Sequence, residues 1–500
     1  MNIEAQGSAA ADQDSTKTDE VRPVPIAVAR GDGIGPEIMD ASLAVLQAAG
    51  AQLDIHEVLL GEKAYLAGHT NGLDASVWET LRQTRALYKS PITTPQGGGY
   101  KSLNVTIRKS MGLFANVRPC VAYTPFVDSK NPGMDVVIVR ENEEDLYAGI
   151  EHRQTDEVYQ CLKLVSRPGC EKIVRYAFDY ARANGRKKVS CFSKDNIMKL
   201  TDGLFHDVFD EIAAEYPDIE TDHWIIDIGA AMLADQPEIF DVVVTSNLYG
   251  DIVSDITAQI SGSVGIGPSS NVGEHGAMFE AIHGSAPTIA EQDIANPSGL
   301  LLAGAMMLSH IGQARIAEKI HNAWLRTLED GVHTADLYDP DVTKEKVGTK
   351  AFGEAVIERL GQGPRELTAV TYDPDGTAIE IVSPKPRTAA KKELVGIDIF
   401  VHARSEPNQV GDRMKKAGEG LGVTLDMITN RGVKVWPDPK PETFCTDHWR
   451  CRYMANPDSA FDAKSVVELL QRMIEHEIDF IKTEHLYNFD GKPAFSLGHG

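Results

Sequence analysis

The chain has 500 residues, 42% hydrophobic and 24% charged, which is typical of a globular protein with two or three domains. Its net charge of −24 argues against nucleic acid or an anionic membrane as partner, but allows a small anionic substrate where arginines converge. The six cysteines form no CxxC pair and no zinc spacing, which predicts reduced thiols and a cytoplasmic location.

Three compositional regions precede the C-terminal hundred residues. Residues 1–22 are polar and acidic, resemble neither a secretory signal nor a transit peptide, and predict a disordered tail. Residues 23–361 alternate short apolar strands with helical segments, an α/β pattern. Residues 362–392, rich in proline, lysine and threonine, predict a linker. The strands expected in the α/β region are 26–30, 135–140, 188–193 and 241–246.

Residues 393–500 start a new pattern. Strand and helix signals follow in an order close to βαββαβ, which predicts a small ferredoxin-like α+β domain. It contains no catalytic constellation. His448, Trp449 and Arg450 suit an interface or core role better than a site. Two hypotheses stay open for this domain: it contributes subunit contacts, or it binds a regulatory ligand.

The first glycine-rich turn imitates a nucleotide motif. Residues 31–36, GDGIGP, follow a strand as a dinucleotide fingerprint would, but the third glycine falls one place early and proline occupies its slot. We interpret the segment as a tight strand-to-helix turn.

The glycine-rich stretch 91–104 predicts a loop of uncharged hydrogen-bond donors. These are Thr93, Thr94, Ser102 and Asn104. Further on, residues 280–297 are polar and turn-rich, with small residues that let the backbone approach a flat ligand.

Three arginines offer planar forks matched to carboxylates. Arg108, Arg118 and Arg140 together would hold a di- or tricarboxylate, although each alone is as easily a surface residue. Tyr147 follows Arg140 in an acidic helix start, where it is either a proton donor to an enolate or a structural tyrosine.

Lys194 stands between a strand and a helix. It is either a solvated cap residue or, near a metal-bound hydroxyl, a base or proton relay. Asp227 lies in the apolar run WIIDIG, interpreted as a strand, and a buried charge there needs a partner. That favours Asp227 as a metal ligand.

The segment DVVVTSNLYGDIVSD, residues 241–255, is the most informative. A buried strand leads into a helix on which Asp251 and Asp255 share one face, at the carboxyl end of the strand. Two hard oxygen ligands there suit Mg²⁺ or Mn²⁺. On this segment alone, an acidic helix start that matches the helix dipole stays an equal alternative.

Taken together, residues 25–360 resemble the decarboxylating β-hydroxyacid dehydrogenases, and within them the isocitrate dehydrogenases. Residues 393–500 resemble the extra domain of a longer bacterial subgroup. The motifs that carry the resemblance, in family order, are GDGIGPE, TTPQGGGYKSLNVTIR, NVRP, RENEEDLYAGIE, SKDNIMKLTDG, NLYGDIVSD and HGSAPTIAEQDIANP. The implied fold is that of the family, an α/β architecture distinct from a typical Rossmann domain.

The resemblance implies a metal-assisted oxidation. Mg²⁺ or Mn²⁺ is expected on Asp227, Asp251 and Asp255, while Arg108, Arg118 and Arg140 hold the substrate carboxylates. Thr94, Ser102 and Asn104 are expected to bind substrate from the glycine-rich loop. Hydride passes to the nicotinamide, and CO₂ departs with the metal as electron sink.

The resemblance also assigns the proton steps and the assembly. Lys194 works on the hydroxyl proton and Tyr147 protonates the enolate. In the family the lysine and the first aspartate reach the site from the neighbouring subunit, which implies a homodimer at minimum.

Substrate and cofactor choice depend on two loops. Relatives acting on isopropylmalate carry apolar residues where this chain has Ser102 and Asn104, so isocitrate is the expected substrate, with homoisocitrate behind it. An inactive scaffold of the same fold is disfavoured because the chain retains every proposed catalytic and metal residue.

The cofactor loop follows HGSAP. NADP-dependent relatives usually continue with Lys-Tyr and NAD-dependent ones with Asp-Ile, whereas this chain has Thr288 and Ile289, and Glu291 adds an acid. These residues predict NAD, with NADP as the alternative if Lys344 or Lys346 reaches its 2′-phosphate. The expected cofactor-binding residues are Thr93, His283, Gly284, Ser285, Ala286, Pro287, Thr288, Ile289 and Asn296.

Overall fold

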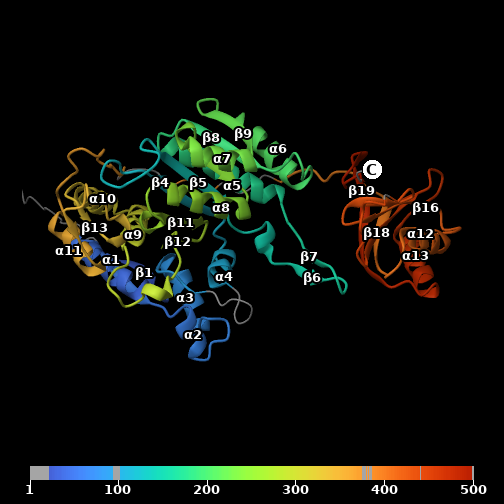
Figure 1. Cartoon of the computed structure of the whole chain (residues 1–500), viewed down its shortest axis with the longest axis horizontal. Coiled ribbons are helices and arrows are strands. Elements are labelled where there is room, and N and C mark those ends of the chain that lie inside the picture. Colours follow the sequence, from blue (N-terminus) through green and yellow to red (C-terminus); the bar gives the residue numbers. More distant parts are fainter. Residues whose placement is uncertain are drawn as a thin grey trace, which may run out of the picture.

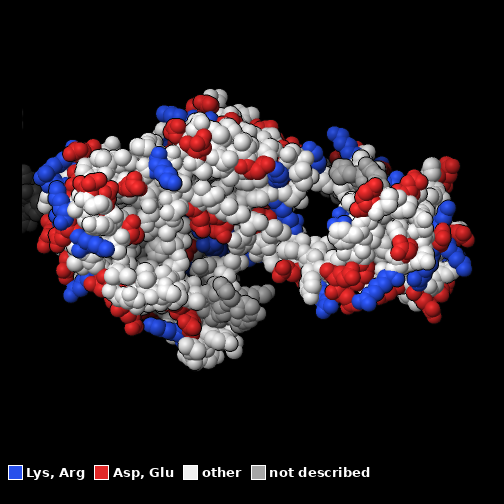
Figure 2. All heavy atoms as spheres, viewed as in Figure 1, with Lys and Arg blue, Asp and Glu red and all other residues white. Residues whose placement is uncertain are grey.

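The computed structural model describes residues 22–93, 102–373, 379, 381, 386–439 and 441–497. A large α/β body and a smaller C-terminal domain stand side by side (Figure 1). Among the described helices, none combines the length and apolar character needed to cross a bilayer. On the face seen in Figure 2, acidic and basic side chains are interspersed.

A single sheet runs through the body. Its ten strands are ordered β2-β1-β3-β12-β11-β4-β5-β10-β8-β9, and every antiparallel pair involves β4 or β11. The central strands are valine-rich and buried on both faces, as expected for strands covered by helices. The strands are β1 (Val24–Ala29), β2 (Leu53–Glu57), β3 (Ala86–Lys89), β4 (Ala115–Val121), β5 (Asp135–Glu141), β8 (Lys188–Ser193), β9 (Glu220–Ile225), β10 (Val242–Thr245), β11 (Pro268–Gly273) and β12 (Gly276–Ala281).

Helices cover both faces of this sheet. One apolar core lies between the sheet and α1, α9, α10 and α11, and a second lies under α5 and α6. The helices of the body are α1 (Gly35–Ala49), α2 (Glu62–Leu66), α3 (Ala75–Thr84), α4 (Leu103–Ser110), α5 (Arg167–Ala183), α6 (Thr201–Ala213), α7 (Ile226–Asp235), α8 (Asn247–Ile260), α9 (Ser298–His310), α10 (Ala314–Glu329) and α11 (Thr349–Glu358). The predicted α/β fold class is confirmed.

Two local predictions are wrong. The run 224–229 is not one strand, because β9 ends at Ile225 and α7 begins at Ile226, so Asp227 lies in the first turn of a helix. An apolar run this short does not distinguish a strand from a helix start. The acidic segment at Tyr147 forms only a single 3-10 turn, η1 (Leu146–Ala148).

The C-terminal domain is an antiparallel sheet with two helices on one face. Strands β16-β18-β15-β19 and helices α12 and α13 follow the predicted βαββαβ order, with β17 and β20 added at the sheet edges. Its core includes Ile397, Trp449 and Leu469. The elements are β15 (Lys392–His402), α12 (Pro407–Ala417), β16 (Val423–Asn430), β17 (Val433–Trp436), β18 (His448–Ala455), α13 (Ala463–Glu475), β19 (Phe480–Phe489) and β20 (Lys492–Pro493).

Two segments outside the main sheet make contacts between parts of the chain. A hairpin, β6 (Glu151–Arg153) and β7 (Tyr159–Cys161), leaves the body and reaches the C-terminal domain (Figure 1). The first part of the predicted linker packs on the body, because Leu367, Val370 and Tyr372 contact the core under α10. The predicted N-terminal tail lies almost wholly outside the described residues.

Candidate active site

Arginines and aspartates meet where β4, β5 and α8 converge. Arg118 Nη1 lies 3.2 Å from Asp255 Oδ1 and 3.7 Å from Asp251 Oδ1. Arg140 forms an ion pair with Asp251. The approach requires glycine at position 250, since a Cβ there would lie 2.4 Å from Arg140 Cγ. The predicted i, i+4 pair of aspartates therefore faces two of the three predicted arginines.

Tyr147 joins the same cluster. Its hydroxyl donates to Asp251 Oδ2 at 2.5 Å, and its ring lies under the Arg140 guanidinium, 5.0 Å from the ring centroid. Burial, followed by the hydrogen bond to Asp251, raises the pKa of Tyr147. The phenol is therefore protonated at neutral pH and placed as a donor.

Burial sets the charges of this cluster. Arg140 is 1% exposed, and its burial, helped by repulsion from Arg118 and Arg108, lowers its pKa to about 10, so it stays charged. Burial alone would raise the pKa of Asp251, but Arg140 and Arg118 bring it below its usual value. Burial raises the pKa of Asp255.

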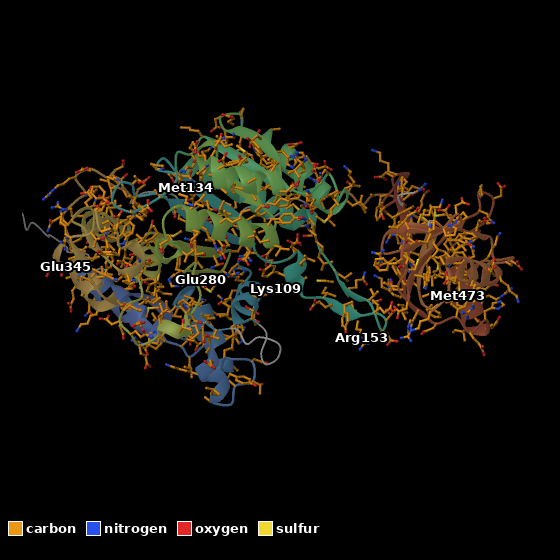
Figure 3. The ribbon with its side chains drawn as sticks, viewed as in Figure 1. Lys109, Met134, Arg153, Glu280, Glu345 and Met473 are labelled. Carbon is orange, nitrogen blue, oxygen red and sulfur yellow. The ribbon has the colours of Figure 1, made fainter. Side chains whose placement is uncertain are left out.

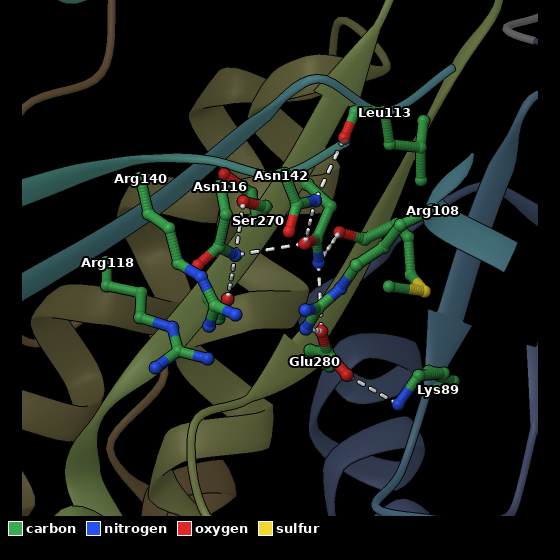
Figure 4. Close-up of polar contacts among 12 residues, drawn as sticks. Lys89, Arg108, Leu113, Asn116, Arg118, Arg140, Asn142, Ser270 and Glu280 are labelled. Carbon is green, nitrogen blue, oxygen red and sulfur yellow. Dashed lines mark hydrogen bonds and ion pairs between the residues drawn. The ribbon is translucent and has the colours of Figure 1, made fainter. Parts of the chain in front are cut away.

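Arg108 is held from below by a buried ion triad (Figure 4). Glu280 on β12 accepts from Arg108 Nη2 at 3.0 Å and from Lys89 Nζ on β3 at 2.5 Å. Asn271 Nδ2 donates to the same carboxylate at 2.9 Å. Burial would raise the pKa of Glu280, but Lys89 and Arg108 hold it well below its ordinary value.

Sequence reasoning missed Lys89 and Glu280. Each is a charged residue inside a short apolar strand. The same pattern drew attention in the sequence only to Asp227. Glu280 and Lys89 occupy neighbouring strands whose parallel register continues from the pair Phe279 and Tyr88. Lys89 and Glu280 thus hold Arg108, whose charge contributes to the lowered pKa of Asp251.

Several buried polar atoms of this region lack a hydrogen-bond partner among the described residues: Arg108 Nε, Arg118 Nε and Asn104 Oδ1. Unpaired buried donors are costly, and two guanidinium nitrogens suit an anionic ligand. Ser102 and Asn104 lie at the start of α4, the helix that carries Arg108. Thr94 falls outside the described residues.

The predicted cofactor loop packs against the turn 31–36 and against Thr93. Thr93 Oγ1 lies 2.8 Å from Ser285 Oγ, and Ile34 N donates to Ser285 O at 2.9 Å. A Cβ at Gly33 would lie 1.9 Å from Ser285 O, so the turn 31–36 serves close packing, as interpreted. Burial lowers the pKa of His283, and its Nε2 is buried without a partner among the described residues.

The remaining predicted cofactor residues differ in their surroundings. Ile289 packs against the hydrophobic core of the body, while Thr288 is exposed. Packing against the core is therefore sufficient to account for an apolar residue at position 289. Asn296 is buried, with its amide donating to Asp336 and its oxygen accepting from Ser298 N.

Lys194 and Asp227 form a separate pair. Lys194 Nζ lies 2.9 Å from Asp227 Oδ1, and among the described residues neither contacts the arginine cluster. Asp227 is largely exposed, so its interpretation as a buried charge is wrong; it lies in a helix start. Hydrogen bonding by Lys194 lowers the pKa of Asp227.

An apolar surface adjoins this pair. Four large side chains of neighbouring sequence positions are at least half exposed: Ile197, Leu200, Ile228 and Ile252. Ile228 follows Asp227 on α7 and Ile252 follows Asp251 on α8, while Ile197 and Leu200 lie between Lys194 and α6. Exposed apolar side chains gathered in this way are typical of protein interfaces.

Known proteins match this architecture over its whole length. The profile of isocitrate/isopropylmalate dehydrogenase matches residues 25–356. The chain belongs to that family. A second profile, the C-terminal domain of bacterial isocitrate dehydrogenase, matches residues 392–500. The predicted family and its longer bacterial subgroup are confirmed.

Individual relatives extend over nearly the entire chain. "Isocitrate dehydrogenase [NADP]" of Rickettsia bellii is 54% identical over 95% of this chain and 99% of the relative. The protein of the same name from Thermus thermophilus is 42% identical over 95% of both. The crystal structure of TT0538 protein from Thermus thermophilus superposes with a TM-score of 0.89, at 41% identity over 95% of both chains.

These names overturn the predicted cofactor. The full-length relatives are named for NADP, so the prediction of NAD is wrong. The prediction rested on the residue types at Thr288, Ile289 and Glu291, and these types did not distinguish NAD from NADP. The prediction of isocitrate dehydrogenase itself is confirmed, with the NADP form the better supported alternative.

Proposed function

We propose that this chain is an NADP-dependent isocitrate dehydrogenase, which converts isocitrate to 2-oxoglutarate and CO₂. The observation that carries the proposal is the convergence of Arg118, Arg140 and Tyr147 on Asp251, with Arg108 held nearby by Glu280. A tricarboxylate needs several forked cations in one place, and its decarboxylation needs a proton donor beside them.

Binding of substrate and metal ion would replace the ion pairs between the arginines and the aspartates. The guanidinium groups of Arg118 and Arg140 now neutralise Asp251 and Asp255. Bound isocitrate would pair its carboxylates with Arg118 and Arg140, and Asp251 and Asp255 would hold Mg²⁺ or Mn²⁺. Carboxylate oxygens are the ligands these ions prefer. The bound ion supplies Lewis-acid stabilisation of negative charge on the substrate oxygens.

Two side chains move protons. Lys194 accepts the proton of the substrate hydroxyl as hydride leaves the carbon that carries this hydroxyl. Tyr147 protonates the carbon from which CO₂ has departed, a role that its raised pKa and its bond to Asp251 support. Arg140, stacked on the tyrosine ring, favours the phenolate left behind.

The active unit is a homodimer in the cytoplasm. Among the described residues, Lys194 and Asp227 do not contact the arginine cluster of their own chain, and exposed apolar side chains lie near them in the sequence. Docking of this surface on a second copy would bury the apolar side chains and deliver Lys194 and Asp227 to that copy's aspartates. Two sites are thereby shared across one interface.

The cofactor lies along the 283–289 loop. The contact between Thr93 and Ser285 joins this loop to the substrate loop, so nicotinamide and isocitrate meet at their junction. The buried, unpartnered His283 Nε2 supports a polar ligand there. Thr288 and its exposed neighbours form the adenosine end.

The test compares initial rates with isocitrate and Mn²⁺ in the presence of NADP or NAD, with isopropylmalate and homoisocitrate as substrate controls. We expect turnover of isocitrate with a kcat/KM favouring NADP. Preference for NAD would overturn the cofactor, and turnover of a control substrate in place of isocitrate would overturn the substrate.

A further inference from the structure

The tip of the β6–β7 hairpin is fastened to the C-terminal domain by polar contacts. Figure 3 places Arg153 of the hairpin beside that domain. Thr155 Oγ1 donates to Asp447 Oδ1 at 2.5 Å, and Asp447 N donates to Glu157 Oε2 at 3.0 Å. Thr155 and Asp447 are both buried. These residues are about three hundred positions apart in the chain and meet only in the tertiary structure.

The carboxylate of Asp447 is only half satisfied. Oδ1 accepts from Thr155, but Oδ2 is buried without a hydrogen bond from any described residue, and the whole residue is 3% exposed. His402 Nε2 lies 3.2 Å from this oxygen, which is within ion-pair distance. A buried carboxylate needs compensating positive charge, which either a protonated His402 or a metal ion held by both side chains would supply.

The surroundings of His402 have the arrangement of a metal ligand. Its other nitrogen, Nδ1, lies 3.4 Å from the carboxylate of Asp479. Imidazoles that bind metals commonly direct their second nitrogen to a carboxylate, which leaves Nε2 free for the ion. Asp156 completes the group: ligand atoms of Asp156, His402 and Asp447 all lie within 4.8 Å of one another.

The distances suit a small divalent ion. Nitrogen and oxygen ligands at about 2.0–2.2 Å in a tetrahedron are separated by about 3.3–3.6 Å, close to the 3.2 Å between His402 Nε2 and Asp447 Oδ2. One imidazole with two carboxylates favours zinc over the oxygen-binding magnesium ion. Asp156 Oδ2 pairs with Arg404 at 2.9 Å and its Oδ1 lies 3.5 Å from Arg153, so metal binding would replace two partly exposed ion pairs.

We propose that Asp156, His402 and Asp447 form a zinc-class site that fastens the hairpin tip to the C-terminal domain. This gives that domain a structural task, independent of the isocitrate chemistry. The ligands come from both sides of the contact, so the bound ion would stabilise the attachment.

A second histidine cluster is the matched alternative. Asp195, His206 and His223 also lie within 4.8 Å of one another. There, however, the imidazole rings stack at 3.6 Å between centroids and are nearly parallel, and His206 Nδ1 is already 2.7 Å from Asp195. A metal ion lies in the plane of each imidazole that binds it, which stacked rings do not permit.

The experiment measures Zn²⁺ binding to the full-length protein, stripped with a chelator and returned to millimolar Mg²⁺ to occupy the active site. Competition with a chromogenic chelator gives affinity and stoichiometry. We expect one Zn²⁺ per chain, with binding lost in His402→Asn. In Asp479→Asn, which removes only the supporting carboxylate, we expect about 10–100-fold weaker binding. Zn²⁺ should raise the Tm of the unaltered protein but not of His402→Asn.

The controls are His206→Asn, in the alternative cluster, and His485→Asn, an exposed histidine of the same domain. Both should bind Zn²⁺ as the unaltered protein does. Absence of Zn²⁺ binding, binding retained in His402→Asn, or binding lost in His206→Asn would each overturn the proposal. If His402→Asn does not fold, Asp479→Asn decides, because Asp479 is mostly exposed.

Discussion

The arginine cluster and the Lys194–Asp227 pair, which the proposed dimer would bring into one site, differ in how the chain holds them. Arg108, Arg118 and Arg140 are buried and held by carboxylates of their own chain. Lys194 and Asp227 contact each other at the surface, beside exposed isoleucines and a leucine. The first is preorganised by folding, whereas the second is presented for assembly, and each should fail in its own way when altered.

The largest expected effect separates the cluster from the pair by complementation. Lys194→Met and Tyr147→Phe should each lower kcat by about 10²–10⁴-fold, since each removes a proton-transfer group. If Lys194 acts on a second copy, a mixed dimer of the two variants contains one intact site. An equal mixture, after subunit exchange, should recover about a quarter of the unaltered activity. Activity that stays at the level of the single variants would place Lys194 in its own chain's site.

Substitution at the buried arginine cluster should lower the free energy of unfolding. Glu280→Gln keeps the shape of the side chain but leaves Lys89 and Arg108 without their counter-charge. Breaking a buried ion pair in this way costs about 3–5 kcal/mol of unfolding free energy, measured by denaturant unfolding. Glu354→Gln, at an exposed ion pair, is the control and should change it by less than about 0.5 kcal/mol. Equal effects in the two variants would contradict the triad's role.

The stabilisation lost in Glu280→Gln should itself depend on pH. The folded pKa of Glu280 lies well below its ordinary value, so its stabilisation is complete above the unfolded pKa, near 4.5, and is lost as pH falls through the folded one. The stability difference between the unaltered protein and Glu280→Gln should be constant from neutral pH to about 5 and narrow only in stronger acid. A difference that changes between pH 6 and 8 would point to another group.

The smallest effect concerns substrate affinity. Arg118→Lys keeps the charge but loses the fork, and should raise the KM for isocitrate about 10–100-fold, the loss of one or two charge-assisted hydrogen bonds. Arg175→Lys, at a surface pair with Glu215, is the matched control and should leave KM unchanged. A KM effect of equal size in both would remove Arg118 from the substrate site.

Much of the site could be predicted because its signals are local. The spacing of Asp251 and Asp255 fixes their shared helix face. The family motifs grouped Arg118 with Arg140, and the structure places both on adjacent strands. Lys89 and Glu280 escaped prediction because their pairing depends on strand order in the sheet. Asp227 was placed wrongly because an apolar run does not say whether a helix begins inside it.

The sequence by itself determined the family, the α/β and ferredoxin-like folds, and the residues proposed to bind a tricarboxylate, since these depend on periodicity and ordered motifs. Only the tertiary structure decided that Ile289 faces the core, that Glu280 supports Arg108, and that the hairpin reaches Asp447. The physical reason is that burial and charge pairing are set by neighbours in space, and those neighbours are distant in the chain.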